Sequence, residues 1–102
     1  REDHARAARV MTDPQRVAAI SVNLLRIAEW YYKDPARNGT LCQRYLEQSL
    51  ALCTQVQAPE AREYLQRLET LSLQTSAESV AHTAERFLTL GVLLQHPERW
   101  MR

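Results

Sequence analysis

The side chains best suited to chemistry lie close together near the C-terminal end of the sequence. Glu78, His82 and Glu85 are spaced by four and three residues, so on a helix they would share one face. Nitrogen and oxygen ligands in such a row could hold a metal ion. However, helical di-iron sites need a Glu-x-x-His pair on each of two helices, and no second motif exists here. Because this face also points away from the predicted core, we expect a solvated polar face with no metal and no cofactor.

The two cysteines and two glycines limit other chemistry. Cys42 and Cys53 are eleven residues apart in one predicted helix, which separates them by roughly 16 Å and prevents a disulfide within that helix. They fit small buried side chains in a reducing cytoplasm, with an intermolecular disulfide or a reactive thiol as alternatives. Gly39 and Gly91 are too few for a phosphate-binding loop, and G-x-S-x-G is absent. No catalytic residues are predicted, and we expect a protein that is not an enzyme.

The segment that should position everything else is residues 13–33. Its apolar residues recur at spacings of three and four, which places them on one stripe of a helix: Val17, Ile20, Leu24, Ile27 and Tyr31. Ala28, Leu25 and Tyr32 would widen that stripe, whereas Arg16, Asn23, Arg26 and Lys33 would face away. Asp13 is the expected cap, with Pro14 at the first helical position.

Three further helices are predicted. The second spans about 40–57 and begins with a Thr40/Gln43 capping box after a loop over 34–39. Its central stripe comprises Leu41, Tyr45, Leu52 and Val56, flanked by Cys42, Leu46, Ser49 and Cys53. The third spans about 59–73 and begins at Pro59. The fourth spans about 76–96, and its inner face is expected to hold Ala77, Val80, Ala81, Ala84, Phe87, Leu88 and Gly91.

These patterns predict an all-α domain, an antiparallel four-helix bundle with short loops, over residues 13–96. Residues 1–12 would form a peripheral N-terminal arm, either a frayed helix, a disordered arm or a vector-derived extension. Residues 97–102 would form a C-terminal tail. No apolar run reaches the roughly 18–20 residues that span a bilayer, and no secretory leader is visible, so we expect a cytoplasmic, bacterial protein with no membrane contact.

Large side chains at the edge of the pattern suggest partner binding. Trp30 lies beside Arg26 on an otherwise polar face, and aromatic residues next to arginine are typical of interface anchors. The alternative is a tryptophan at the edge of the core. The last helix becomes apolar all round between Leu90 and Leu94, so Leu90, Leu93 and the tail residue Trp100 are the other predicted anchors.

A second hypothesis is that the protein binds nucleic acid. Residues 73–93, which end in RFLTLGVL, resemble the recognition helix of winged-helix regulators, over about a fifth of the chain. The resemblance implies DNA contacts from Ser76, Ser79, His82, Thr83 and Arg86. The chain departs from that family because only nine residues follow Leu93, too few for a wing, and because Glu78 stands where a basic residue would meet phosphate.

The sequence therefore favours a small protein–protein interaction module, such as an adaptor, a chaperone-like protein or a regulator. Self-association into a homodimer through the last helix is the expected specific form. A helix-turn-helix DNA-binding regulator is the alternative. With a net charge of only +1, no overall positive field would attract the chain to nucleic acid.

Overall fold

The computed structural model describes residues 11–73 and 77–96, with side chains omitted at 77–79. Within these ranges the chain is helical with no strand. It forms the helices α2 (Asp13–Lys33), α3 (Pro35–Cys53), α4 (Pro59–Leu68) and α5 (Ala77–Gln95). The predicted all-α, four-helix fold is confirmed. No helix of the described part is long and apolar enough to cross a membrane.

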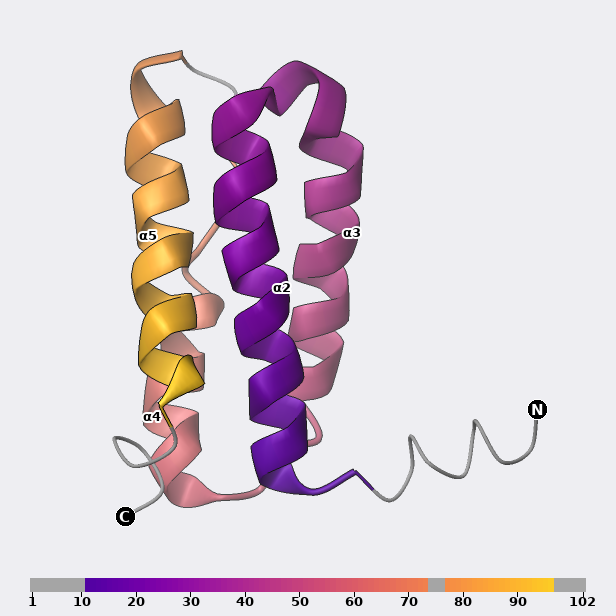
Figure 1. The fold of residues 1–102 in the computed structure, drawn as a ribbon. Helices are drawn as coiled ribbons and strands as arrows, with labels where there is room; N and C mark the ends of the chain where they lie inside the picture. Colours follow the sequence, from indigo (N-terminus) through magenta and orange to yellow (C-terminus); the bar gives the residue numbers. More distant parts are fainter. Residues whose placement is uncertain (1–10, 74–76, 97–102) are drawn as a thin grey trace, which may run out of the picture.

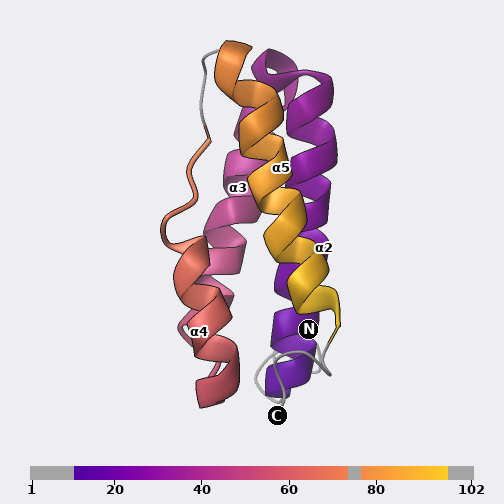
Figure 2. The ribbon, with the colours of Figure 1, turned by 90° about the vertical axis from the view of Figure 1, so that its left-hand side faces the viewer.

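Helix α2 lies between α3 and α5 and packs along both of them (Figure 1). The short α4 contacts α5 and α3 at one end of the bundle, as the turned view shows (Figure 2). One continuous core joins the elements. Its largest fully buried side chains are Phe87, Ile20, Leu24, Ile27, Leu68, Leu94, Val17 and Val56.

The predicted bounds of α2 are confirmed, but the predicted N-cap residue is wrong. Thr12 is the N-cap: its hydroxyl accepts from the Gln15 N–H at 3.2 Å, and the Gln15 side chain accepts from the Thr12 N–H at 2.9 Å. The expected cap, Asp13, is the first helical residue instead. Its carboxylate turns away and accepts from the N–H groups of Gln57 and Ala58, at 3.1 and 2.8 Å. Asp13 therefore ties the start of α2 to the connection between α3 and α4.

The predicted 34–39 loop is wrong, because α3 begins at Pro35 rather than Thr40. Asp34 has a non-helical backbone conformation (φ −160°, ψ 87°), consistent with its place before proline, and its side chain caps α3 by accepting from the Arg37 N–H at 3.0 Å. Asn38 then donates to the Trp30 carbonyl at the end of α2, at 2.9 Å. A single cap residue thus replaces the loop. Asn38 and Gly39 lie within α3, and among the described residues none has a positive φ.

Helices α3 and α4 also end earlier than predicted, at Cys53 and Leu68 instead of 57 and 73. A threonine follows each end at a short distance. The Thr54 hydroxyl donates to the Ala51 carbonyl, and the Thr70 hydroxyl donates to the Arg67 carbonyl, each at 2.7 Å. Such bonds occupy the terminal carbonyls that further helical N–H groups would need, so they compete with helix continuation.

The buried stripes differ from the prediction in three places. In α2, Asn23 is buried rather than solvated, and Tyr32 is exposed rather than part of the core. In α3 the buried residues are Cys42, Leu46 and Ser49, which were predicted to flank the central stripe, so the buried face is rotated about one position from the predicted centre. In α5, Leu88 and Ala81 are exposed rather than inward. All the predicted stripe residues of α2, from Val17 to Tyr31, are buried.

Candidate functional site

Helices α2 and α5 are in close contact at Gly91. The Ser21 hydroxyl donates to the Gly91 carbonyl at 2.7 Å. A Cβ at position 91 would lie 2.9 Å from Leu25 Cδ2 and 3.3 Å from Leu24 Cβ, closer than side chains normally pack. The missing side chain of Gly91 therefore allows this contact between the two helices.

Residues of both helices also line an apolar groove of about 530 Å³ at the surface. Ala28 and Ala84 are buried alanines in its lining, and Ala81 adds a third small side chain. Small residues on both walls leave room that larger ones would fill. The groove is lined by Leu25, Ala28, Glu29, Tyr32, Lys33, Ala81, Ala84, Glu85 and Leu88.

Large exposed apolar side chains lie at the groove and continue along both helices beyond it. Tyr32 is 63% exposed and Leu88 is 47% exposed, and both line the groove. Val22 and Val92 are 45% and 38% exposed. On α2, Val22 and Tyr32 share a helix face with the groove residue Leu25, and on α5, Leu88 and Val92 share a face with the groove residue Ala81. We call the groove and these flanking side chains the α2–α5 surface.

The charged residues of this surface carry a net negative charge. Glu29 and Glu85 come from opposite walls, and Lys33 is the one cation among the lining residues. Lys33 Nζ lies 3.5 Å from Glu29 Oε2, with both side chains more than 60% exposed, and 5.4 Å from the centre of the Trp30 ring. Glu85 has no ion pair or hydrogen bond with any described residue. Glu85 also lines the neighbouring hollow that contains Arg67 and Arg86, but it forms an ion pair with neither.

The predicted partner anchors of the first helix lie elsewhere on α2. The Arg26 guanidinium lies 5.7 Å from the centre of the Tyr45 ring of α3, and the Trp30 carbonyl binds Asn38 of α3. Trp30 itself is 39% exposed, so it lies at the edge of the bundle on the side of α3. Neither residue lines the groove. Their role as anchors stays a prediction.

The predicted anchors at the C-terminal end are distributed differently. Leu90 belongs to the core and is only 4% exposed, and Leu93 is half-buried. The turn that was expected to be apolar all round therefore has Leu90, Gly91 and Leu94 inside and Val92 outside. Trp100 lies outside the described residues. The large apolar residues that α5 exposes among its described side chains, Leu88 and Val92, were not predicted as anchors.

The residues predicted for the DNA-binding alternative do not share one exposed face. Thr83 is 4% exposed, whereas His82 and Arg86 are exposed. Ser76 lies outside the described residues, and the side chain of Ser79 is not described. His82 and Arg86 line a shallow hollow of about 310 Å³ with Arg67 of α4, and Glu85 lies in the same lining. The two arginines therefore share this surface with a carboxylate.

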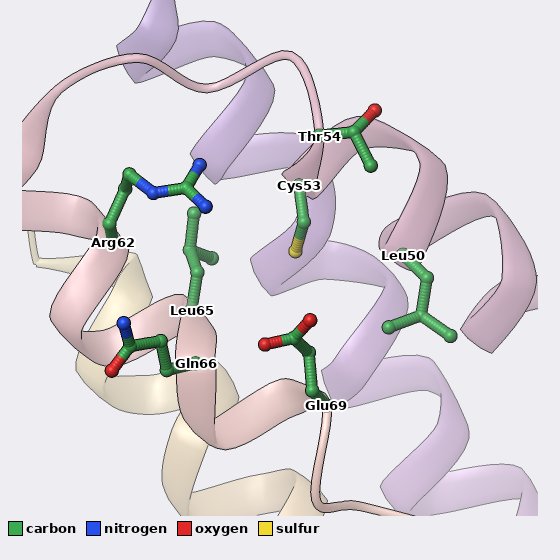
Figure 3. Close-up of a pocket in the computed structure, with 7 residues that line it drawn as sticks. All are labelled: Leu50, Cys53, Thr54, Arg62, Leu65, Gln66 and Glu69. Carbon is green, nitrogen blue, oxygen red and sulfur yellow. The ribbon is translucent and has the colours of Figure 1, made fainter.

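A smaller pocket of about 210 Å³ between α3 and α4 contains Cys53 (Figure 3). The Cys53 sulfur and the Glu69 carboxylate both point into it, and Arg62 lies at its edge (Figure 3). Burial, aided by the negative charge of Glu69, raises the pKa of Cys53 to about 11. The thiol is therefore protonated at neutral pH, which is the opposite of what a nucleophile needs.

Both cysteines are free, and Cys42 is fully buried with its Sγ 4.0 Å from the Ile27 carbonyl. Burial raises the pKa of Cys42 as well. Among residues 11–73 and 80–96, no three His, Cys, Asp or Glu side chains come close enough together to share a metal ion. This statement does not cover Glu78 of the predicted Glu-His-Glu row, because the side chain of Glu78 is not described.

Comparison with known proteins returns no relative: no family model matches the chain, and no curated protein or solved structure is significantly similar to it.

Proposed function

We propose that this domain is a protein–protein interaction module and that the α2–α5 surface is where it binds. The observation that supports this proposal is the grouping of large exposed apolar side chains around one groove. Single exposed leucines or valines are ordinary on a protein surface, but a contiguous patch is typical of a binding site. Here Tyr32, Leu88, Val22 and Val92 flank a hollow with small residues on both walls.

The shape of the surface fits a helical partner. A hydrophobic groove between two helices accepts the apolar stripe of a third helix, whose side chains at i, i+3 or i+4 and i+7 enter the hollow. Ala28, Ala81 and Ala84 leave space for those side chains, and the Tyr32 ring and Leu88 can close over them. Tyrosine is well suited to this role because its large ring has few rotatable bonds.

We place this module in the cytoplasm. Two free cysteines without a disulfide are typical of proteins from reducing compartments, and this supports the placement.

The proposal can be tested by photo-crosslinking in cells that make the protein, with benzoylphenylalanine in place of one aromatic residue. Position 32 is the test and position 30 is the matched control, because both residues are exposed aromatics on α2 but only Tyr32 lines the groove. We expect one discrete adduct from position 32 that disappears in a Leu88→Glu variant of unchanged helicity. Equal adducts from both positions, or none from position 32, would refute the proposed surface. An adduct of twice the chain's own mass would identify self-association.

A further inference from the structure

The charges around the groove indicate what kind of helix it takes. The lining holds Glu29 on α2, Glu85 on α5 and Lys33, which is a net charge of −1. Lys33 already lies beside Glu29 and over the Trp30 ring, whereas Glu85 is without a described partner. Any occupant that covers the groove removes water from these carboxylates. A carboxylate that loses water without gaining a cation opposes binding.

This charge pattern disfavours a second copy of the chain. A face-to-face dimer through the whole surface would bring four carboxylates and only two lysines into one interface, with a net charge of −2. Like charges across an interface reduce affinity. An occupant that carries positive charge beside its apolar stripe has the opposite effect, because it neutralises the groove.

Arginine fits these surroundings better than lysine. Its planar guanidinium can donate two parallel hydrogen bonds to one carboxylate and can also stack on an aromatic ring. The groove offers both partners close together, since the exposed Tyr32 lies in the same lining as Glu29 and Glu85. Stacking of this kind already occurs in the bundle: the Arg26 and Arg67 guanidinium groups lie 5.7 and 5.4 Å from the ring centres of Tyr45 and Tyr64.

We propose that the α2–α5 groove binds an amphipathic helix from another protein, and that arginines flank the apolar stripe of that helix and pair with Glu85 and Glu29. This inference rests on the proposed function and specifies the partner. The apolar stripe would fill the space above Ala28, Ala81 and Ala84, with Leu88 and Tyr32 on either side. The arginines would give the complex its orientation and part of its affinity.

The test uses a displayed library of amphipathic helices of roughly 15 residues, about four turns. Leucines are fixed at i, i+3, i+7 and i+10, and the flanking positions are random. Selection against the full chain should enrich arginine at flanking positions. The enriched peptides should lose binding to Leu88→Glu. They should bind the double variant Glu29→Gln/Glu85→Gln roughly tenfold more weakly, which corresponds to about 1.4 kcal/mol for the lost charge pairs.

Glu63→Gln is the matched control, because Glu63 is an exposed acid on α4 that does not line the groove. Its affinity for the selected peptides should equal that of the unaltered chain. Helicity and thermal unfolding of each variant are measured alongside, so that loss of binding is separated from loss of fold.

Three results would overturn the partner assignment. Enrichment of neutral or acidic flanks would contradict the charge argument, and equal binding by the double variant would show that the carboxylates make no contact. A chain that forms a stable dimer, lost in Leu88→Glu, would show that a second copy occupies the groove. In each of these cases crosslinking from position 32 still decides separately whether the α2–α5 surface is a binding site at all.

Discussion

Replacing Asp13 by alanine should destabilise the bundle more than its position on the first turn of a helix suggests. The Asp13 carboxylate accepts from the N–H groups of Gln57 and Ala58 and from Arg16 Nη1, at 3.1, 2.8 and 3.0 Å. It therefore connects the start of α2 to the segment that leads into α4. The two backbone donors are more than forty residues away in sequence, so the contact is tertiary rather than local.

The size of the effect follows from these bonds. A hydrogen bond to a charged group contributes about 1.5–3 kcal/mol when its partners are shielded from water. The N–H of the exposed Gln57 can bind water once the carboxylate is gone, whereas Ala58 is half-buried and loses its acceptor. We expect Asp13→Ala to lower the free energy of unfolding by about 2 kcal/mol. Asp13→Asn keeps an acceptor oxygen but not the charge, so it should lose about half of that.

The loss of stability in Asp13→Ala should also depend on pH. Burial by itself would raise the pKa of Asp13, but the Ala58 and Gln57 N–H groups and Arg16 outweigh it, so the pKa lies below its ordinary value. A carboxyl group whose pKa is lower in the folded state stabilises the fold above its unfolded pKa, about 3.9. That contribution disappears as the pH falls through the lower, folded value. The difference between the unaltered chain and Asp13→Ala should therefore shrink below about pH 4.

Urea unfolding followed by circular dichroism at pH 7 and at several values below pH 4 measures both effects. Glu63→Ala is the control for removing one acidic charge, and it should change the free energy of unfolding by less than about 0.5 kcal/mol. Equal unfolding free energies for Asp13→Ala and Glu63→Ala at pH 7 would refute the structural role of the carboxylate. A loss in Asp13→Ala that stays constant down to pH 3 would refute the assignment of its charge.

Three other substitutions or measurements test the remaining features. Phe87→Ala should destabilise the chain by about 3–5 kcal/mol, because it removes the largest fully buried side chain, and thermal unfolding will show whether it does. Leu88→Glu should leave the unfolding temperature almost unchanged, since half of that side chain is already in solvent; a large drop would place Leu88 in the core. Cys53 should react with iodoacetamide far more slowly in the folded chain than in urea, because with a pKa of about 11 only about one thiol in a thousand is ionised at pH 8. Equal rates in the two conditions would contradict the raised pKa.

Periodicity predicted the elements well because it reports burial directly. An apolar stripe with spacings of three and four indicates the buried face of a helix. All five residues of that stripe in α2 are in the core: Val17, Ile20, Leu24, Ile27 and Tyr31. The helix boundaries were less predictable where two signals competed. At residues 34–40 the Asp34-Pro35 start and the Thr40/Gln43 capping box are both reasonable, and only the packing of Asn38 against the end of α2 decides between them.

The candidate site could not be read from the sequence in the same way. Tyr32 and Leu88 are large apolar residues at positions where the helical spacing predicts the core. The apolar pattern of one helix does not show how far a neighbouring helix covers each of its residues. The exposure of these two side chains depends on how α2 and α5 pack against each other, and the close contact at Gly91 with the Ser21 hydrogen bond is part of that packing. The prediction for Leu90 is wrong in the opposite direction: it was predicted to be a surface anchor, but its side chain lies in the core.

The position of the groove follows from the width of the apolar arc on α2. Its central stripe is covered by α3 on one side and by α5 on the other, and both neighbours reach α2 along much of its length (Figure 1). The arc extends past that cover at Tyr32, which stays exposed, and the main contacts of α4, a helix of only 10 residues, are with α5 and α3. The packing of these four helices therefore leaves apolar surface exposed on α2 and α5. Tyr32 and Leu88 are 63% and 47% exposed, so burying what is left of each would contribute roughly 1–2 kcal/mol, and the partner helix proposed above would provide that burial.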